Sequence, residues 1–500
     1  MSNRINIQQV AVIGAGTMGL GIAQVAAQAG HEVRLYDAHP AQTARALDDF
    51  ASRLADRVAR GKLSEQDAAA LRARLTPAAS LNELADADLV IEAIVERLDI
   101  KQQLFAELEG ICGERCILAS NTSSISITAI GAALARPERL AGLHFFNPAP
   151  VMKLVEVISG LATAAAVRDT LLALARDWGK VAVHASSTPG FIVNRIARPY
   201  YGETLRALQE GVAEPQVLDA LMRSAGFPMG ACELTDLIGQ DVNFAVSASV
   251  YRAFFDEPRY RPSLVQQALV EAGRLGRKSG RGFYRYQGGQ PEVPALPSPA
   301  GRAPERVIVR GDWSGLRGVE ALLARYPGTI ERENGAPALL IDGVCVELTN
   351  GQSAALRHPG RAAMALDWVE DYEQAPCLAL GVSACCTPEQ VAAVTGFFQA
   401  LGKQVLLLSD HPGLLVLRTL ATLVNEAAEA CLHGVASPED IDLAMRYGVN
   451  YPKGPVAWGA EIGYRRLLAL LEQLHALYGE DKYRPSLTLR HWAAMEEAHD

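Results

Sequence analysis

A glycine-rich turn between a short apolar run and a helical stretch constrains the fold of this chain most strongly. Residues 10–13 are apolar and predict a buried strand, and three glycines follow with the spacing G-x-G-x-x-G. The first glycine permits a tight turn, the second lets the backbone approach a pyrophosphate, and the third allows close packing of the next helix. Free N–H groups at the start of that helix would face the phosphates. The predicted dinucleotide-binding loop comprises Gly14, Ala15, Gly16, Thr17, Met18 and Gly19.

The residues after this helix indicate which dinucleotide binds. Gly30 is a suitable C-terminal cap, residues 31–36 alternate as a second strand, and Asp37 follows. A carboxylate about twenty residues beyond the glycines accepts hydrogen bonds from a ribose 2′-hydroxyl and repels a 2′-phosphate. The pattern therefore favours NAD over NADP. The alternative is a glycine turn in an unrelated α/β protein.

Length and composition exclude several classes of protein. A chain of 500 residues is too long for one hydrophobic core, so we expect several domains. A net charge of −9 without a basic stripe argues against nucleic acid as a partner. No signal pattern begins the chain, no apolar run reaches transmembrane length, and the eight cysteines lack metal-ligand spacing. We expect a reduced, cytoplasmic enzyme that has no metal and binds no membrane.

Strand and helix patterns along the chain predict an α/β protein with four domains. Residues 1–187 alternate strands and helices and predict a Rossmann-type, doubly wound, mostly parallel sheet. Residues 188–288 predict an all-α domain, and a linker rich in glycine and proline follows. Residues 305–404 predict a reduced α/β connector without a catalytic role. Residues 405–500 predict a second copy of the all-α domain.

The duplication of the helical domain is recognised from residues that recur at an offset of 223 positions. The matching pairs include Gly179-Lys180 and Gly402-Lys403, Thr188-Pro189-Gly190 and His411-Pro412-Gly413, Glu203 and Glu426, and Tyr260 and Tyr483. Asn194 corresponds to Leu417, so a polar group of the first copy is lost in the second. We predict that the second copy is degenerate and packs against the first. The chain would then be an intrachain pseudo-dimer, with a homodimer as the alternative.

A histidine and a carboxylate on neighbouring predicted strands form the candidate catalytic pair. His144 follows the strand-like residues 140–143, and Glu156 lies twelve residues later in the apolar run 154–158. A buried carboxylate needs a partner, and a histidine oriented by a carboxylate acts as a general base. Beside a nicotinamide, such a base removes a hydroxyl proton as hydride leaves the carbon. The alternative is a core histidine with an unrelated salt bridge.

Polar residues also follow two other predicted strands. Glu96 and Lys101 follow the apolar strand 89–94, and a run of serine, asparagine and threonine, 120–124, follows the strand 116–119. In open α/β sheets, ligands bind beyond the carboxyl ends of the strands. We therefore expect cofactor and substrate to meet near these side chains.

Five motifs occur in the order typical of the L-3-hydroxyacyl-CoA dehydrogenases, which this chain resembles over about residues 5–286. The motifs are Gly14–Gly19, Glu92–Glu96, Ser120–Ser124, His144–Pro148 and Thr188–Arg195. The duplicated helical domain is similar to that of the long bacterial members linked to phenylacetate breakdown, which act on 3-hydroxyadipyl-CoA. The resemblance implies that an L-3-hydroxyacyl-CoA and NAD give a 3-oxoacyl-CoA, NADH and a proton.

The resemblance also implies roles for individual residues. His144 would be the general base and Glu156 its partner, while Ser123 and Asn194 would bind the C3 oxygen of the substrate. The further contacts to NAD would come from Glu96, Lys101, Asn147 and Lys278. Arg53 and Arg60 would contact coenzyme A, although their residue types differ from the family pattern. A solvated helix face is the alternative interpretation of these two arginines.

The acyl group is left open by the sequence. A carboxylate at its far end would need a basic or hydrogen-bonding partner, and Lys153 and Arg198 lie near the motif residues. A 3-hydroxybutyryl-CoA dehydrogenase and a related hydroxy-acid dehydrogenase on the same scaffold are the alternatives. A non-catalytic NAD-binding protein is the remote one, because mere binding needs neither His144 nor Glu156.

Overall fold

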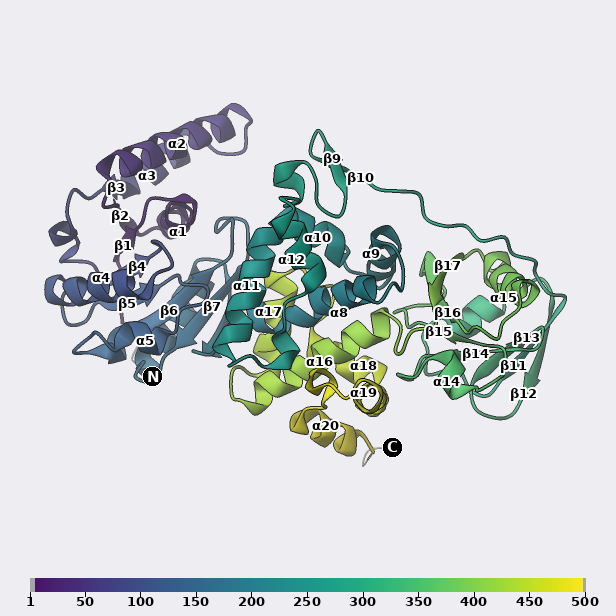
Figure 1. Cartoon of the computed structure of the whole chain (residues 1–500). Helices are drawn as coiled ribbons and strands as arrows, with labels where there is room; N and C mark the ends of the chain where they lie inside the picture. Colours follow the sequence, from purple (N-terminus) through teal and green to yellow (C-terminus); the bar gives the residue numbers. More distant parts are fainter. Residues whose placement is uncertain (1–4, 498–500) are drawn as a thin grey trace. The chain divides into compact units, whose positions relative to one another are not determined.

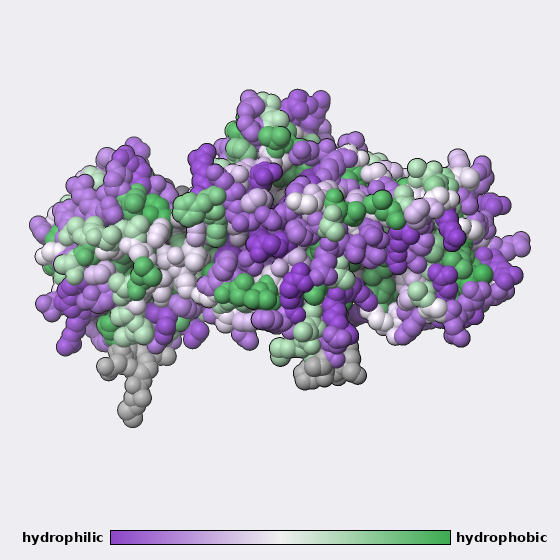
Figure 2. All heavy atoms as spheres, turned by 60° about the horizontal axis from the view of Figure 1, so that its bottom comes forward, coloured by the Kyte–Doolittle hydropathy of each residue, from purple (hydrophilic) through white to green (hydrophobic). Residues whose placement is uncertain are grey.

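The computed structural model describes residues 5–497, which divide into two compact units. The first unit contains the described residues up to Arg195 together with residues 433–449, and the second contains the remainder. Within the described residues, no helix combines the length and the apolar character needed to cross a membrane. On the face drawn in Figure 2, hydrophobic residues form small groups among hydrophilic ones.

An eight-stranded sheet lies at the centre of the first unit (Figure 1). In sheet order, its strands are β3 (Leu75–Pro77), β2 (Glu32–Tyr36), β1 (Gln9–Ile13), β4 (Leu89–Glu92), β5 (Ile117–Ser120), β6 (Leu140–Phe145), β7 (Leu154–Ser159) and β8 (Val181–Ser186). Neighbouring strands are parallel except β6 and β7, which are antiparallel. The central strands are nearly continuous apolar runs because parallel sheets are covered on both faces. The predicted Rossmann-type sheet is confirmed.

Helices of the first unit pack their apolar sides on this sheet. They are α1 (Thr17–Gln28), α2 (Pro40–Ala59), α3 (Glu65–Arg74), α4 (Leu98–Ile111), α5 (Ile127–Gly131), α6 (Ala165–Asp177), α7 (Val193–Ile196, whose last residue belongs to the second unit) and α17 (Pro438–Gly448). Leu20 of α1 and Leu171 of α6 share one hydrophobic core with Val12 and Val157 of the strands. This core fixes the carboxyl ends of the strands, where the candidate site residues lie.

Residues 433–449 depart from the predicted domain ranges. They were predicted as part of the second helical copy, but they lie with the first unit. The backbone N–H of Ser186 donates to the carbonyl of Val435 at 2.8 Å, and that of His184 donates to Asp440 Oδ2 at 3.3 Å. Pairing along the exposed edge of β8 explains why this segment leaves its own copy.

The second unit contains both helical copies. The first copy comprises α8 (Arg198–Gln209), α9 (Pro215–Ser224), α10 (Ala231–Ile238), α11 (Gln240–Ala253) and α12 (Leu264–Glu271), followed by a hairpin of β9 (Arg285–Gln287) and β10 (Gln290–Glu292). The second copy contributes α16 (Val416–Leu432), α18 (Pro455–Ile462), α19 (Tyr464–Tyr478) and α20 (Leu487–Glu497). Both are labelled in Figure 1.

Equivalent residues of the two copies bind each other reciprocally. Tyr260 donates a hydrogen bond to Glu426 at 2.6 Å, and Tyr483 donates one to Glu203 at 3.1 Å. Each tyrosine is therefore paired with the glutamate of the other copy, as in a twofold interface between identical subunits. Arg418 and Lys482 hold the pKa of Glu203 at about 2 despite its burial, so this interface contains an ionised carboxylate. The two helical copies pack against each other within one chain.

A seven-stranded mixed sheet forms the connector between the copies. Its strands, in sheet order, are β12 (Thr329–Glu333), β11 (Arg306–Arg310), β13 (Ala338–Ile341), β14 (Val344–Leu348), β15 (Ala363–Leu366), β16 (Cys377–Val382) and β17 (Gln404–Ser409), and its helices are α13 (Val319–Leu323), α14 (Ala354–Arg357) and α15 (Pro388–Ala400). Strands β16 and β17 and helix α15 repeat β7, β8 and α6 at the same offset of 223 residues. The duplication therefore begins inside the connector, and β17 extends five residues past the predicted boundary at 404.

Candidate active site

The glycine loop between β1 and α1 has the geometry of a phosphate-binding turn. A Cβ atom at Gly14, where φ is +101°, would lie 2.4 Å from the carbonyl oxygen of Ala93, and one at Gly19 would lie 1.7 Å from that of Gly14. These two glycines are required by the protein itself. A Cβ at Gly16 would meet no atom within 4 Å, so the space beside Gly16 is open to a ligand. The first turn of α1 carries no acidic residue, which leaves its N–H groups available to an anion.

Asp37 lies directly after β2 and is tied to the glycine loop. Its Oδ2 accepts the N–H of Ala15 at 2.8 Å, and its Oδ1 accepts that of His39 at 2.9 Å. Each carboxylate oxygen can accept a second hydrogen bond. The carboxylate therefore retains the acceptor capacity that a ribose hydroxyl needs.

A buried ion pair lies under the ends of β4 and β5. Lys101 Nζ is 2.6 Å from Glu92 Oε1, and both side chains are at most 1% exposed. Ser120 donates to the other oxygen of Glu92 at 2.6 Å, and the N–H of Ile94 donates to Oε1 at 2.7 Å. The sequence analysis assigned no role to Glu92, although an acidic residue inside the apolar run of β4 was a signal for one.

Glu96 organises the serine-rich loop that follows β5. Its Oε1 accepts hydrogen bonds from the Thr122 hydroxyl at 2.6 Å and from the N–H groups of Ser123 and Ser124 at 3.0 and 3.1 Å. Burial raises the pKa of Glu96, but these bonds and the charge of Lys101, 3.3 Å away, bring it below its usual value. The loop therefore surrounds a fixed carboxylate, and Ser123 itself is exposed.

His144 and Glu156 face each other across the antiparallel pair β6 and β7. Their residues are direct partners in the strand register, and His144 Nδ1 is 2.7 Å from Glu156 Oε2. The histidine is 4% and the glutamate 1% exposed. Glu156 Oε1 accepts the N–H groups of Ile192 and Val193 at 3.0 and 3.1 Å, which fixes the carboxylate. His144 Nε2 has no hydrogen-bond partner among residues 5–497, so this nitrogen is available to a substrate.

The other predicted site residues lie in diverse surroundings. Asn147 is exposed, and Asn194 is half-buried in α7. Lys278 lies in the second unit, where it forms an ion pair of 2.6 Å with Asp241 and lowers the pKa of that carboxyl. Arg53 and Arg60 are exposed at the end of α2 and form no salt bridge with described residues.

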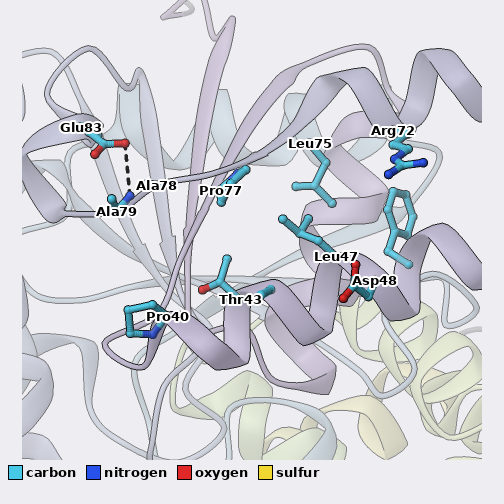
Figure 3. Close-up of a pocket in the computed structure, with 12 residues that line it drawn as sticks. Pro40, Thr43, Leu47, Asp48, Arg72, Leu75, Pro77, Ala78, Ala79 and Glu83 are labelled. Carbon is cyan, nitrogen blue, oxygen red and sulfur yellow. Dashed lines mark hydrogen bonds between the residues drawn. The ribbon is translucent and has the colours of Figure 1, made fainter.

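A cavity of about 580 Å³ lies between α2 and the edge strand β3 (Figure 3). Its apolar lining includes Leu47, Leu75 and Pro77, and Arg72 lies at one side. None of the predicted site residues lines it. The cavity therefore contributes nothing to the dyad.

One cluster of metal-ligating residue types lies in the connector. Ligand atoms of Cys345, Glu347 and His358 lie within 4.8 Å of one another. Glu347 is already 2.8 Å from Arg357 and 2.9 Å from His358. A carboxylate neutralised by an arginine is a poor metal ligand, so we assign this cluster to the ion-pair network of the connector.

The equivalent of the dyad in the duplicated half contains different chemistry. His144 corresponds to Asp367 at the offset of 223 residues, and Glu156 corresponds to Ala379. Asp367 accepts the N–H groups of Leu415, Val416 and Leu417, and its burial raises its pKa to about 6. It thereby takes over the structural contacts of Glu156 without a histidine to orient.

Three models from one family match most of the chain. The NAD-binding domain of 3-hydroxyacyl-CoA dehydrogenase matches residues 9–188, and the C-terminal domain of that enzyme matches residues 190–286 and again 413–499. The reduced Rossmann-fold domain of 3-hydroxybutyryl-CoA dehydrogenase matches residues 346–412. The double match of the C-terminal domain agrees with the duplication.

Individual relatives match over the full length or over the first half. The 3-hydroxyadipyl-CoA dehydrogenase of Escherichia coli K12 is 49% identical over 99% of both chains. A crystal structure of a 3-hydroxybutyryl-CoA dehydrogenase from Escherichia coli K12 has a TM-score of 0.90 and 48% identity, covering 99% of this chain and 100% of that one. A probable 3-hydroxybutyryl-CoA dehydrogenase of Bacillus subtilis is 43% identical over 57% of this chain and 99% of its own.

Proposed function

This chain belongs to the 3-hydroxyacyl-CoA dehydrogenase family, and we propose that its substrate is 3-hydroxyadipyl-CoA, which it oxidises to 3-oxoadipyl-CoA with NAD. The hydrogen-bonded pair of His144 and Glu156 carries the assignment of the reaction. The full-length similarity to a 3-hydroxyadipyl-CoA dehydrogenase supports the assignment of the acyl group.

The dyad performs the proton transfer of this reaction. His144 Nε2 takes the proton of the C3 hydroxyl as the C3–H bond breaks and hydride leaves. Glu156 accepts a hydrogen bond from Nδ1, keeps Nε2 unprotonated before the reaction and stabilises the imidazolium that forms. NAD, when bound, supplies the acceptor for the hydride. In the reverse direction the imidazolium returns its proton to the oxygen of the 3-oxo group.

The other site residues bind and orient. We assign Ser123 and Asn194 to the C3 oxygen, and Glu96 and Asn147 to the nicotinamide half of NAD. Lys101 is almost fully buried against Glu92, so we assign it to that half through its hold on Glu96. Lys278 would contribute a cofactor contact, and the exposed Arg53 and Arg60 would neutralise phosphates of coenzyme A. The second helical copy would be non-catalytic and supply the surface of a pseudo-dimer.

Steady-state kinetics with two substrates test the assigned acyl group. We expect a higher kcat/KM for 3-hydroxyadipyl-CoA than for 3-hydroxybutyryl-CoA under the same conditions. 3-Hydroxybutyryl-CoA is the second candidate substrate because the 48% identical crystal structure carries that name. A higher kcat/KM for the four-carbon substrate would replace the proposed acyl group with this one.

Asp37 is the proposed determinant of NAD over NADP. Its replacement by alanine removes the negative charge that opposes a 2′-phosphate, so kcat/KM for NADP relative to NAD should rise about tenfold or more. Asp88→Ala is a matched control, because Asp88 also accepts backbone N–H groups, those of Gln8 and Gln9, but at the amino end of β4. An unchanged cofactor ratio in the Asp37 variant would show that the carboxylate does not face the ribose.

A further inference from the structure

The guanidinium of Arg198 is buried without an acidic partner. Arg198 is 8% exposed and begins α8. Its Nη1 donates to Ser247 Oγ at 2.9 Å, its Nε is buried without an acceptor, and its Cζ lies 5.0 Å from the centre of the Tyr201 ring. In the described part of the chain, no carboxylate lies within ion-pair distance of it.

Other buried arginines of this protein show what Arg198 lacks. Arg418 is 2.7 Å from Glu203, and Arg259 is 3.7 Å from Glu426. A buried charge is costly unless it is paired, and an arginine stays cationic at neutral pH even where burial lowers its pKa, as it does here. Arg198 is therefore placed to receive an anionic group that is not part of the chain.

The internal duplication separates functional from structural residues. Positions that hold the two copies together are retained at the offset of 223 residues, as Glu203 and Glu426 and as Tyr260 and Tyr483 show. Arg198 instead corresponds to Ala421, which is fully buried. The second copy folds and packs without this arginine, so the helical domain does not need it for its structure.

The position of Arg198 in its helix suits the far end of an acyl chain. It follows Asn194 by four residues, and the intervening Ala197 has helical dihedral angles, so about one turn of roughly 5.4 Å separates the two residues along the chain. In a 3-hydroxyadipyl group the terminal carboxyl carbon is three carbon–carbon bonds beyond C3. A C3 oxygen bound by Asn194 leaves this carboxylate within reach of the next turn.

We propose that Arg198 is the specificity-determining residue that binds the terminal carboxylate of the acyl group. Ser247 orients the guanidinium, and the apolar face of Tyr201 covers it. A substrate with a methyl end would leave the guanidinium buried and unpaired, which disfavours that substrate. This inference rests on the proposed function, because it requires a dicarboxylic acyl group.

Two substrates of equal length test the proposal. For wild type, kcat/KM should be about 10²-fold or more higher with 3-hydroxyadipyl-CoA than with 3-hydroxyhexanoyl-CoA, which ends in a methyl group. Arg198→Met should abolish this ratio by lowering kcat/KM for the adipyl substrate alone, and Arg198→Lys should restore part of it. Arg223→Met is the matched control, because Glu233 already neutralises Arg223 on the neighbouring α9.

The outcomes separate this inference from the proposed function. A wild type that does not prefer the adipyl substrate contradicts the proposed acyl group, and with it the role of Arg198. A wild-type preference that survives in Arg198→Met overturns the role of Arg198 alone. An equal loss with both substrates assigns Arg198 a structural role and also overturns the proposal. Thermal unfolding without ligand checks this last case, since Arg198→Met should be no less stable than wild type.

Discussion

Replacing His144 with glutamine is expected to lower kcat by about 10²–10⁴, the usual contribution of a positioned general base. Glutamine can keep a hydrogen bond to Glu156, but it cannot take a proton from the C3 hydroxyl. The affinity for NAD should change little, because His144 bonds to Glu156 and not to the glycine loop. Stopped-flow measurement of NADH formation and titration of NADH fluorescence give the two quantities.

A second histidine of the same unit provides the control for this prediction. His184 on β8 is half-buried and lies 3.0 Å from Ser159 Oγ, so His184→Gln makes the same change away from the dyad. Turnover of this control should remain near that of wild type. If His144→Gln turned over as fast as His184→Gln, His144 would have no part in the proton transfer.

Lys101→Met is expected to destabilise the protein by about 3–5 kcal/mol, because it leaves the Glu92 carboxylate buried and without its cation. The pair is almost completely shielded from water, with 1% exposure for the lysine and 0% for the glutamate. The change also removes the charge beside Glu96, so the serine-rich loop should lose order. Urea-induced unfolding at neutral pH measures the stability.

An exposed ion pair on the same helix is the control for Lys101. Arg97 and Asp99 lie near the start of α4, and both are more than half exposed. Arg97→Met should leave stability nearly unchanged because solvent screens such pairs. In addition, the double change Glu92→Leu with Lys101→Met should recover much of the loss. Equal stability of the Lys101 and Arg97 variants would contradict the importance of the buried pair.

The parts of the site that depend on local sequence could be predicted. The turn at Gly14, the carboxylate after β2 and the pairing of His144 with Glu156 follow from short patterns: glycine spacing, strand alternation and a titratable residue in an apolar run. Each involves one or two neighbouring strands. The fold class followed from the same patterns.

Other parts depend on contacts that sequence spacing does not reveal. Glu92 and Lys101 are nine residues apart, and only the packing of α4 against the sheet shows that they share one buried site. The role of Arg198 depends on an absence, the lack of a carboxylate among its neighbours in three dimensions. Asp367 was missed because it replaces His144 with a different residue type, and only the strand register reveals the equivalence.

Consumption of NADH with acetoacetyl-CoA tests the central claim most directly. The account predicts rapid, enzyme-dependent loss of NADH absorbance with this thioester, slower loss with NADPH, and no loss with free acetoacetate. The His144→Gln variant, purified in the same way, should be slower by the factor given above. If free acetoacetate reacted and the thioester did not, the assignment to 3-hydroxyacyl-CoA chemistry would be contradicted.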